Sequence, residues 1–139
     1  MVYAIIDAVS DVEELITVAY AEMPCELAAW FVSELRENAD MYLSSDSDFA
    51  LVDEACESIN VICDDENADL SDVDGIVVEA GDISLSVVGA YYTYEDMKKG
   101  LSEFLSDKPA YSKVNVPDNE NESIKILDEL NAELIRCSF

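Results

Sequence analysis

Carboxylates are the side chains of this sequence whose number and spacing could support chemistry. The chain has 139 residues, with 32 Asp and Glu against 7 Lys and Arg and no His, for a formal charge of −25. Carboxylates can bind divalent cations, transfer protons in catalysis, or pair with the basic side chains of a partner. Their spacing and the residues around them distinguish these three kinds of chemistry.

An acidic segment near the middle of the chain matches part of a calcium-binding loop. Asp72, Asp74 and Gly75 fit three positions of the EF-hand pattern, with the glycine in the sixth position. The first and twelfth positions, however, hold Leu70 and Gly81 where carboxylates are required. We therefore expect neither a bound metal nor a cofactor, and a calcium-binding protein is only a distant alternative.

The residue types also give little support to catalysis. The chain has no histidine, no phosphate-binding glycine loop and no nucleophile motif. Paired carboxylates such as Asp53 and Glu57 are common, but an acid–base pair needs one carboxyl group in an apolar pocket. We expect that the protein is not an enzyme. The four cysteines form no C-x-x-C pair and are expected to be buried free thiols: Cys25, Cys56, Cys63 and Cys137.

The negative charge is concentrated in one part of the chain. Residues 1–97 contain 24 acidic residues and one basic residue, Arg36, whereas residues 98–139 contain 8 acidic and 6 basic residues. Residues 1–97 therefore carry a formal net charge of −23. Duplex DNA presents about one charge per 1.7 Å, so this equals the charge on roughly 39 Å of duplex. A compact chain of this length has a diameter of roughly 35–40 Å, so its charge is comparable to that of DNA.

Halophilic adaptation is an alternative explanation for an acidic surface. Adaptation to a salty medium should act on the whole surface, yet residues 98–139 are close to balance. Lysine also outnumbers arginine by five to two. The uneven distribution of charge favours a defined binding surface over a general adaptation to salt.

The sequence predicts several elements that would position the carboxylates. A short strand is expected at residues 2–6, and the capping-box pattern Ser10-x-x-Glu13 predicts a helix over residues 11–22. Apolar residues at helical spacing predict further helices over residues 24–43 and 48–63. We expect these three helices to form an acidic wall.

The second half of the chain predicts a small sheet and two more helices. A hairpin is expected near residues 76–91, with its turn at Gly81, followed by a helix over residues 94–106. An extended segment over residues 110–116 and a last helix near residues 121–136 complete the chain. The predicted fold is a helix-rich α+β single domain, residues 1–139, with a small antiparallel sheet.

Two of the predicted helices carry carboxylates opposite their apolar side. These recur three or four residues apart, which places them roughly 5–6 Å from one another, near the spacing of phosphates. Residues 64–66 follow the expected end of a helix, where negative charge opposes the macrodipole and a functional reason is expected. The predicted partner-binding residues are Glu34, Glu37, Asp40, Asp46, Asp48, Asp53, Glu54, Glu57, Asp64, Asp65, Glu66, Asp69, Asp72 and Asp74.

In its charge pattern, the chain is similar to the DNA-mimic proteins that phages and mobile elements use against restriction or CRISPR systems. The similarity is to a functional class and depends on composition. It implies an anti-CRISPR or anti-restriction inhibitor that occupies the nucleic-acid-binding surface of a basic partner, without binding nucleic acid or membrane itself. Residues 1–7 lack the basic residues of a signal peptide, so a cytoplasmic location is expected. The alternative is an immunity protein that neutralises a nuclease toxin.

Overall fold

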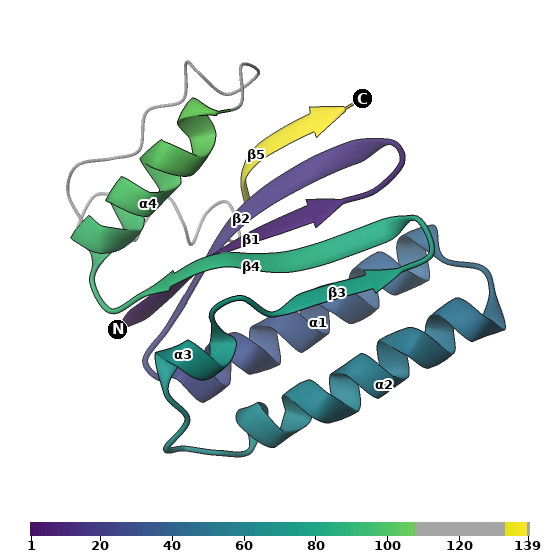
Figure 1. The fold of residues 1–139 in the computed structure, drawn as a ribbon, viewed down its shortest axis with the longest axis horizontal. Coiled ribbons are helices and arrows are strands. Elements are labelled where there is room, and N and C mark those ends of the chain that lie inside the picture. Colours follow the sequence, from purple (N-terminus) through teal and green to yellow (C-terminus); the bar gives the residue numbers. More distant parts are fainter. Residues whose placement is uncertain (108–132, 139) are drawn as a thin grey trace.

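The computed structural model describes residues 1–107 and 133–138, which form an antiparallel sheet with helices on both faces (Figure 1). The strands are β1 (Val2–Val9), β2 (Glu13–Ala21), β3 (Val77–Ala80), β4 (Ile83–Tyr91) and β5 (Glu133–Ser138), in the sheet order β3-β4-β1-β2-β5. The helices are α1 (Pro24–Tyr42), α2 (Asp46–Cys63), α3 (Leu70–Val73) and α4 (Tyr94–Ser106). The predicted α+β class is confirmed.

The N-terminal part of the prediction is wrong, because the segment expected to be a helix forms strand β2. Its sequence from Glu13 to Ala21 is rich in β-branched residues, which favour a pleated strand. The hydroxyl of Ser10 accepts a hydrogen bond from the backbone N–H of Val12, at 3.4 Å, in the turn between β1 and β2. Ser10 therefore stabilises a tight turn instead of capping a helix, and the acidic wall loses one of its three predicted helices.

The last predicted helix is also wrong where the structure describes it. Residues 133–136 lie in strand β5, which pairs with β2 from Glu13↔Ser138 to Thr17↔Glu133. This pairing satisfies backbone groups that β2 would otherwise expose at the edge of the sheet. The remainder of that predicted helix, and the extended segment predicted over residues 110–116, lie outside the described residues.

The other predicted elements are confirmed to within a few residues. Helix α1 begins at Pro24, where the fixed backbone angle and missing N–H of proline are tolerated. Thr93 caps α4 by accepting a hydrogen bond from the backbone N–H of Asp96, at 3.2 Å. The hairpin of β3 and β4 turns at Gly81, whose φ of 54° lies in the left-handed region that glycine adopts most easily.

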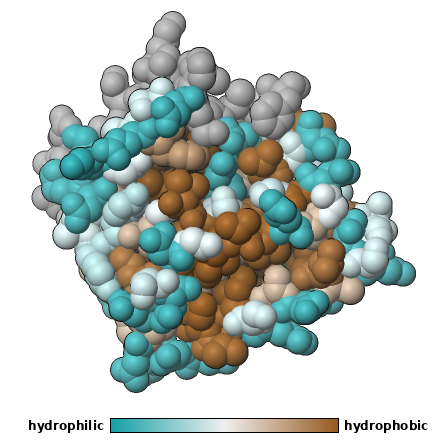
Figure 2. All heavy atoms as spheres, in the orientation of Figure 1, coloured by the Kyte–Doolittle hydropathy of each residue, from teal (hydrophilic) through white to brown (hydrophobic). Residues whose placement is uncertain are grey.

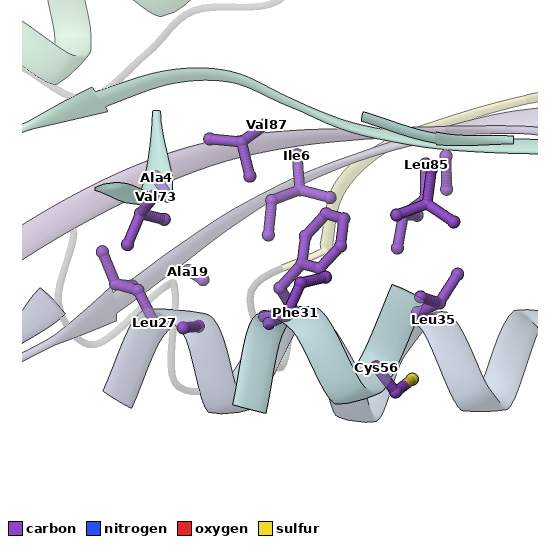
Figure 3. Close-up of a cluster of buried hydrophobic side chains, with 14 of the residues drawn as sticks. Ala4, Ile6, Ala19, Leu27, Phe31, Leu35, Cys56, Val73, Leu85 and Val87 are labelled. Carbon is purple, nitrogen blue, oxygen red and sulfur yellow. The ribbon is translucent and has the colours of Figure 1, made fainter. Parts of the chain in front are cut away.

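Alternation along the strands builds a core on each face of the sheet. The even-numbered residues of β1 face α1 and α2, whereas Tyr3 and Ile5 face α4. Figure 3 shows the larger core, in which Phe31 and Leu35 of α1 point at Ile6, Leu85 and Val87 of the sheet. Because α1 is fixed to the sheet by these fully buried side chains, its outer surface is held rigidly.

Two turns at the same end of the sheet bring carboxylates together. Asp11 lies in the turn between β1 and β2, and Asp82 lies in the turn between β3 and β4; the pairing of Val9 with Ser84 makes these turns neighbours. Repulsion from the Asp82 carboxylate, with smaller contributions from desolvation and a hydrogen bond to Asp82, raises the pKa of Asp11 above its ordinary value of 3.8. The pair therefore destabilises the folded state when both groups are ionised.

We expect that Asp82→Asn increases stability at neutral pH. An acid whose pKa is raised by folding favours the folded state only below its ordinary pKa, and that contribution is lost as the pH rises through the raised value. The advantage of the variant should therefore be present at pH 7 and vanish below about pH 3.8. Urea unfolding across this range measures it. An equal gain from Glu103→Gln, on exposed α4 surface, would attribute the effect to net charge alone.

Candidate functional site

Helices α1 and α2 pack side by side against the sheet and turn their outer surfaces to solvent (Figure 1). A three-residue connection joins them, so they run antiparallel. Their apolar sides are buried through Phe31 and Leu35 on α1 and through Val52 and Cys56 on α2. The two helices therefore form one stable layer whose exposed side is available to carry charge.

This exposed side carries a continuous set of carboxylates, which we call the acidic helical face. On α2, Asp46, Asp53, Glu57 and Asp64 are spaced by seven, four and seven residues, a pattern that aligns them along one flank of a helix. The members of the face, all exposed, are Glu26, Glu37, Asp40, Asp46, Asp53, Glu54, Glu57 and Asp64. Seven of these eight residues were predicted from the sequence.

Glu26 was not predicted, although the sequence contained a signal for it. It precedes Glu37 by eleven residues, which is about three helical turns, so both side chains lie on the same side of α1. The stripes predicted on the helices join carboxylates that stand three or four residues apart, whereas Glu26 is eight residues from Glu34. A search at three-turn spacing would have found Glu26.

Of the residues predicted on α1 and α2, two are not on the acidic helical face. Glu34 is half-buried and stands roughly 200° around α1 from Arg36, which reaches toward α2. Asp48, in the first turn of α2, is half-buried against the β3–β4 turn. A Cβ atom added to Gly81 of that turn would lie 2.6 Å from the Asp48 Oδ2 atom. Both carboxylates belong to the flanks of the helical layer.

A single ion pair connects the two helices across the face. The Arg36 Nη1 atom lies 3.1 Å from the Asp53 Oδ1 atom, and both side chains are more than half exposed. Exposed pairs of this kind contribute about 0.2–1 kcal/mol to stability. Arg36 is the one basic residue of residues 1–97, and it occupies Asp53. Glu54 and Glu57 are therefore better placed than Asp53 to meet an external cation.

The predicted end of α2 is confirmed, and Asp64 is its C-cap residue, with no basic residue in the last turn. Beyond it, however, the carboxylates have local structural roles. Asp65 accepts a hydrogen bond from the backbone N–H of Asn67, at 2.9 Å, which stabilises the turn that follows the helix. Asp69 and Asp72 form a capping box around the short helix α3. These hydrogen bonds give Asp65, Asp69 and Asp72 structural roles in addition to the binding role predicted from the sequence.

Asp69 also contacts the end of strand β4. The hydroxyl of Tyr92 donates a hydrogen bond to the Asp69 Oδ1 atom, at 2.5 Å, and the backbone N–H of Leu70 donates to the same atom at 2.8 Å. The bond from Tyr92, followed by the bond from Leu70, lowers the pKa of Asp69. The same bond to Asp69 raises the pKa of Tyr92. Asp69, Asp72 and Asp74 thus belong to the α3 region, separate from the acidic helical face.

The structure does not assemble the carboxylates into a metal centre in the part of the chain that it describes. No group of three acidic or cysteine side chains there is placed to hold a metal ion. Cys25, Cys56 and Cys63 are free, and burial raises the pKa of the Cys56 and Cys63 thiols. The acidic helical face is therefore suited to attract cationic groups over a broad surface.

The charged residues do not cover the surface evenly. Figure 2 shows hydrophobic residues gathered across the middle of one face, with hydrophilic residues around them. Val77 of β3, Val88 of β4 and Leu51 of α2 are 59%, 38% and 49% exposed. On this face of the molecule, hydrophilic residues surround an apolar middle instead of covering the surface evenly.

Comparison of the chain with protein-family models, with curated proteins and with solved structures finds no match. Among the helices of the described residues, none has the length and apolar character needed to cross a membrane.

Proposed function

We propose that the protein is an acidic DNA mimic that inhibits a basic partner by binding its nucleic-acid-binding surface in the cytoplasm of a host cell. The observation that supports this most strongly is the acidic helical face, a rigid set of exposed carboxylates on two packed helices. The expected partner is a CRISPR effector, a restriction enzyme or another nuclease. The protein would act as a stoichiometric inhibitor without catalysis of its own.

The charge density of the face is close to that of one side of a DNA duplex. From Asp46 to Asp64 the chain makes 18 helical steps of about 1.5 Å, or roughly 27 Å. A duplex of this length carries about 16 phosphates, and roughly half of them face one side. The acidic helical face carries eight carboxylates over a similar length. A surface that binds duplex DNA through Lys and Arg would therefore meet a comparable number of anions.

Rigidity adds to this resemblance in charge. Phe31 and Leu35 are completely buried beneath α1, and Cys56 is completely buried beneath α2. The backbone that carries the carboxylates is thus fixed before any partner arrives. Binding then requires little further ordering of the chain, which preserves affinity that a disordered acidic segment would lose.

We expect that the triple substitution Glu37→Gln, Glu54→Gln and Glu57→Gln weakens partner binding by about tenfold. Three exposed charge pairs at about 0.5 kcal/mol each amount to roughly 1.4 kcal/mol. Stability should not fall, because the substitutions relieve repulsion within a protein whose formal net charge is −25. The partner would first be captured from a bacterial lysate and identified by mass spectrometry, and affinity would then be measured by surface plasmon resonance.

The matched control is the substitution of Glu79, Glu95 and Glu103 by Gln, which removes the same charge from β3 and α4. We expect this control to bind nearly as tightly as the natural protein. Duplex DNA should compete for the partner, and binding should weaken as salt rises. Equal losses from both triple variants, or simultaneous binding of DNA and protein, would overturn the proposal. Capture of a nuclease toxin encoded beside this gene would identify the face as that of an immunity protein.

A further inference from the structure

A second surface feature lies away from the acidic helical face, between α3, the end of β4 and the start of α4 (Figure 1). There the chain forms an open pocket of about 320 Å³. Its polar and aromatic lining consists of Asp69, Ser71, Asp74, Tyr91, Tyr92 and Asp96. Leu70 and Ala90 complete the wall, so the pocket combines carboxylates and aromatic rings with a small apolar part.

The pocket has a strongly negative lining. Asp69 and Asp74 flank α3, and Asp96 lies in the first turn of α4. Among the residues that the structure describes, none of those lining the pocket is basic. The hydrogen bonds that Asp69 accepts from Tyr92 and Leu70 favour its ionised form and lower its pKa. Three acidic side chains therefore line a cavity that is large enough for a side chain.

The two tyrosine rings in the pocket are held in place. The Tyr92 ring is 60% exposed, and its hydroxyl group is bonded to Asp69. The Tyr91 ring fills the space between Gly89 and Gly100, because a Cβ atom on either glycine would collide with it. Aromatic faces attract cations within about 6 Å of their centre, and a fixed ring loses little entropy when it binds one.

The shape of the lining favours an organic cation over a metal ion. In the described residues, no three carboxylates converge on one point as metal coordination requires. A guanidinium group is planar, stacks on aromatic rings and directs five N–H donors toward acceptors that are spread around it. An ammonium group is a compact and strongly hydrated charge that uses such a lining less well.

We propose that this pocket binds the guanidinium group of one arginine side chain of the partner, placed between the tyrosine rings and the carboxylates. This inference rests on the proposed function and adds a specific contact to it. The acidic helical face attracts a basic surface broadly, whereas the pocket selects a partner that also presents an arginine to the region between α3, the end of β4 and the start of α4. A partner whose surface is rich in lysine but lacks such an arginine should bind more weakly.

The direct test uses N-acetyl-arginine amide as the probe, with the intact protein at low salt. We expect saturable chemical-shift changes in the NMR spectrum at residues 69–74 and 90–96, with a dissociation constant in the millimolar range. The citrulline analogue has nearly the same shape without the charge, and it should cause no saturable change. The lysine analogue should bind at least twofold more weakly than the arginine probe. Changes spread evenly over the acidic helical face, or equal effects from the citrulline probe, would overturn the proposal.

Substitutions in the lining provide the second test. Tyr92→Ala should weaken binding of the arginine probe by about two- to fivefold, and Tyr92→Phe, which keeps the ring, should weaken it less. The double variant Asp74→Asn and Asp96→Asn should weaken binding at least fivefold. Its matched control, Asp82→Asn and Asp107→Asn, removes the same charge outside the pocket and should leave the affinity within twofold. Equal losses from the two double variants would overturn the proposal.

The outcomes for the pocket and for the proposed function are separable. Suppose that the arginine probe fails to bind at the pocket, but the triple variant of the acidic helical face still loses affinity for a nucleic-acid-binding partner. The pocket proposal is then wrong and the mimic proposal stands. If the probe binds at the pocket but DNA does not compete with the captured partner, the pocket proposal stands and the mimic proposal falls. Each proposal therefore has its own deciding measurement.

Discussion

Replacement of Phe31 by alanine is expected to lower the free energy of unfolding by about 3–5 kcal/mol. Phe31 is completely buried at the centre of the core between α1 and the sheet (Figure 3). Its removal loses the transfer free energy of the ring and leaves a cavity that fixed neighbours such as Ile6 and Val87 cannot fill. Total stabilities of small domains are about 5–15 kcal/mol, so this loss brings the protein close to unfolding.

Urea unfolding followed by circular dichroism measures this effect, with Trp30→Ala as the control on the same helix. Trp30 is only partly buried, so we expect its loss to be clearly smaller. Because a net charge of −25 opposes compaction, moderate salt should restore part of the stability of the Phe31 variant by screening repulsion. A loss below about 1 kcal/mol would contradict the described packing of α1 on the sheet.

The second large effect is expected from Gly100→Ala in α4, with a sign opposite to the usual one. Glycine within a helix normally destabilises it, so its replacement by alanine gains about 1 kcal/mol. Here the new Cβ atom would collide with the Tyr91 hydroxyl and lie 2.5 Å from the Cζ atom of the ring. Such overpacking typically costs about 1–3 kcal/mol. We therefore expect a net loss of stability of up to about 2 kcal/mol in place of the usual gain.

Two comparisons make this result specific to Tyr91. Ser102→Ala, on the exposed surface of the same helix, should be neutral or slightly stabilising. Combining Gly100→Ala with Tyr91→Leu should recover stability relative to the sum of the single substitutions, because the collision is removed. Thermal and urea unfolding of the four variants gives this coupling. A simple gain from Gly100→Ala would show that Tyr91 does not occupy the space beside the helix.

The helices and the second hairpin could be predicted because their signals are local. Pro24 and Thr93 mark where helices begin, and Gly81 marks a turn between two strands. Strand β2 was missed for a physical reason. The sheet is covered on both faces, so Ile16 and Val18 are buried in one core and Ala19 in the other, without the apolar and polar alternation expected of a half-exposed strand. Strand β5 depends on pairing with a segment more than a hundred residues earlier, which local patterns do not encode.

The candidate site was predictable only in part, for the same reason. Carboxylate stripes on α1 and α2 follow from helical periodicity, and most of the acidic helical face was predicted in this way. The rotation of each helix about its axis is set by packing, so the half-burial of Glu34 and Asp48 could not be predicted. The pocket joins Asp69 to Tyr92 and Asp96, which lie more than twenty residues later in the chain. Only the tertiary structure brings them together.

The position of β1 in the sheet affects how the chain folds during synthesis. This strand is made before the other strands of the sheet, yet it lies between β2 and β4. Val9 can pair with Ser84 only after 75 more residues have been made. At about 5–20 residues per second, the ribosome needs roughly 4–15 s to supply that neighbour. During this interval the hairpin of β1 and β2 exposes an apolar edge that could pair with other nascent chains. The carboxylates made in the meantime repel such chains, so the charge that suits the mature surface also protects the unfinished one.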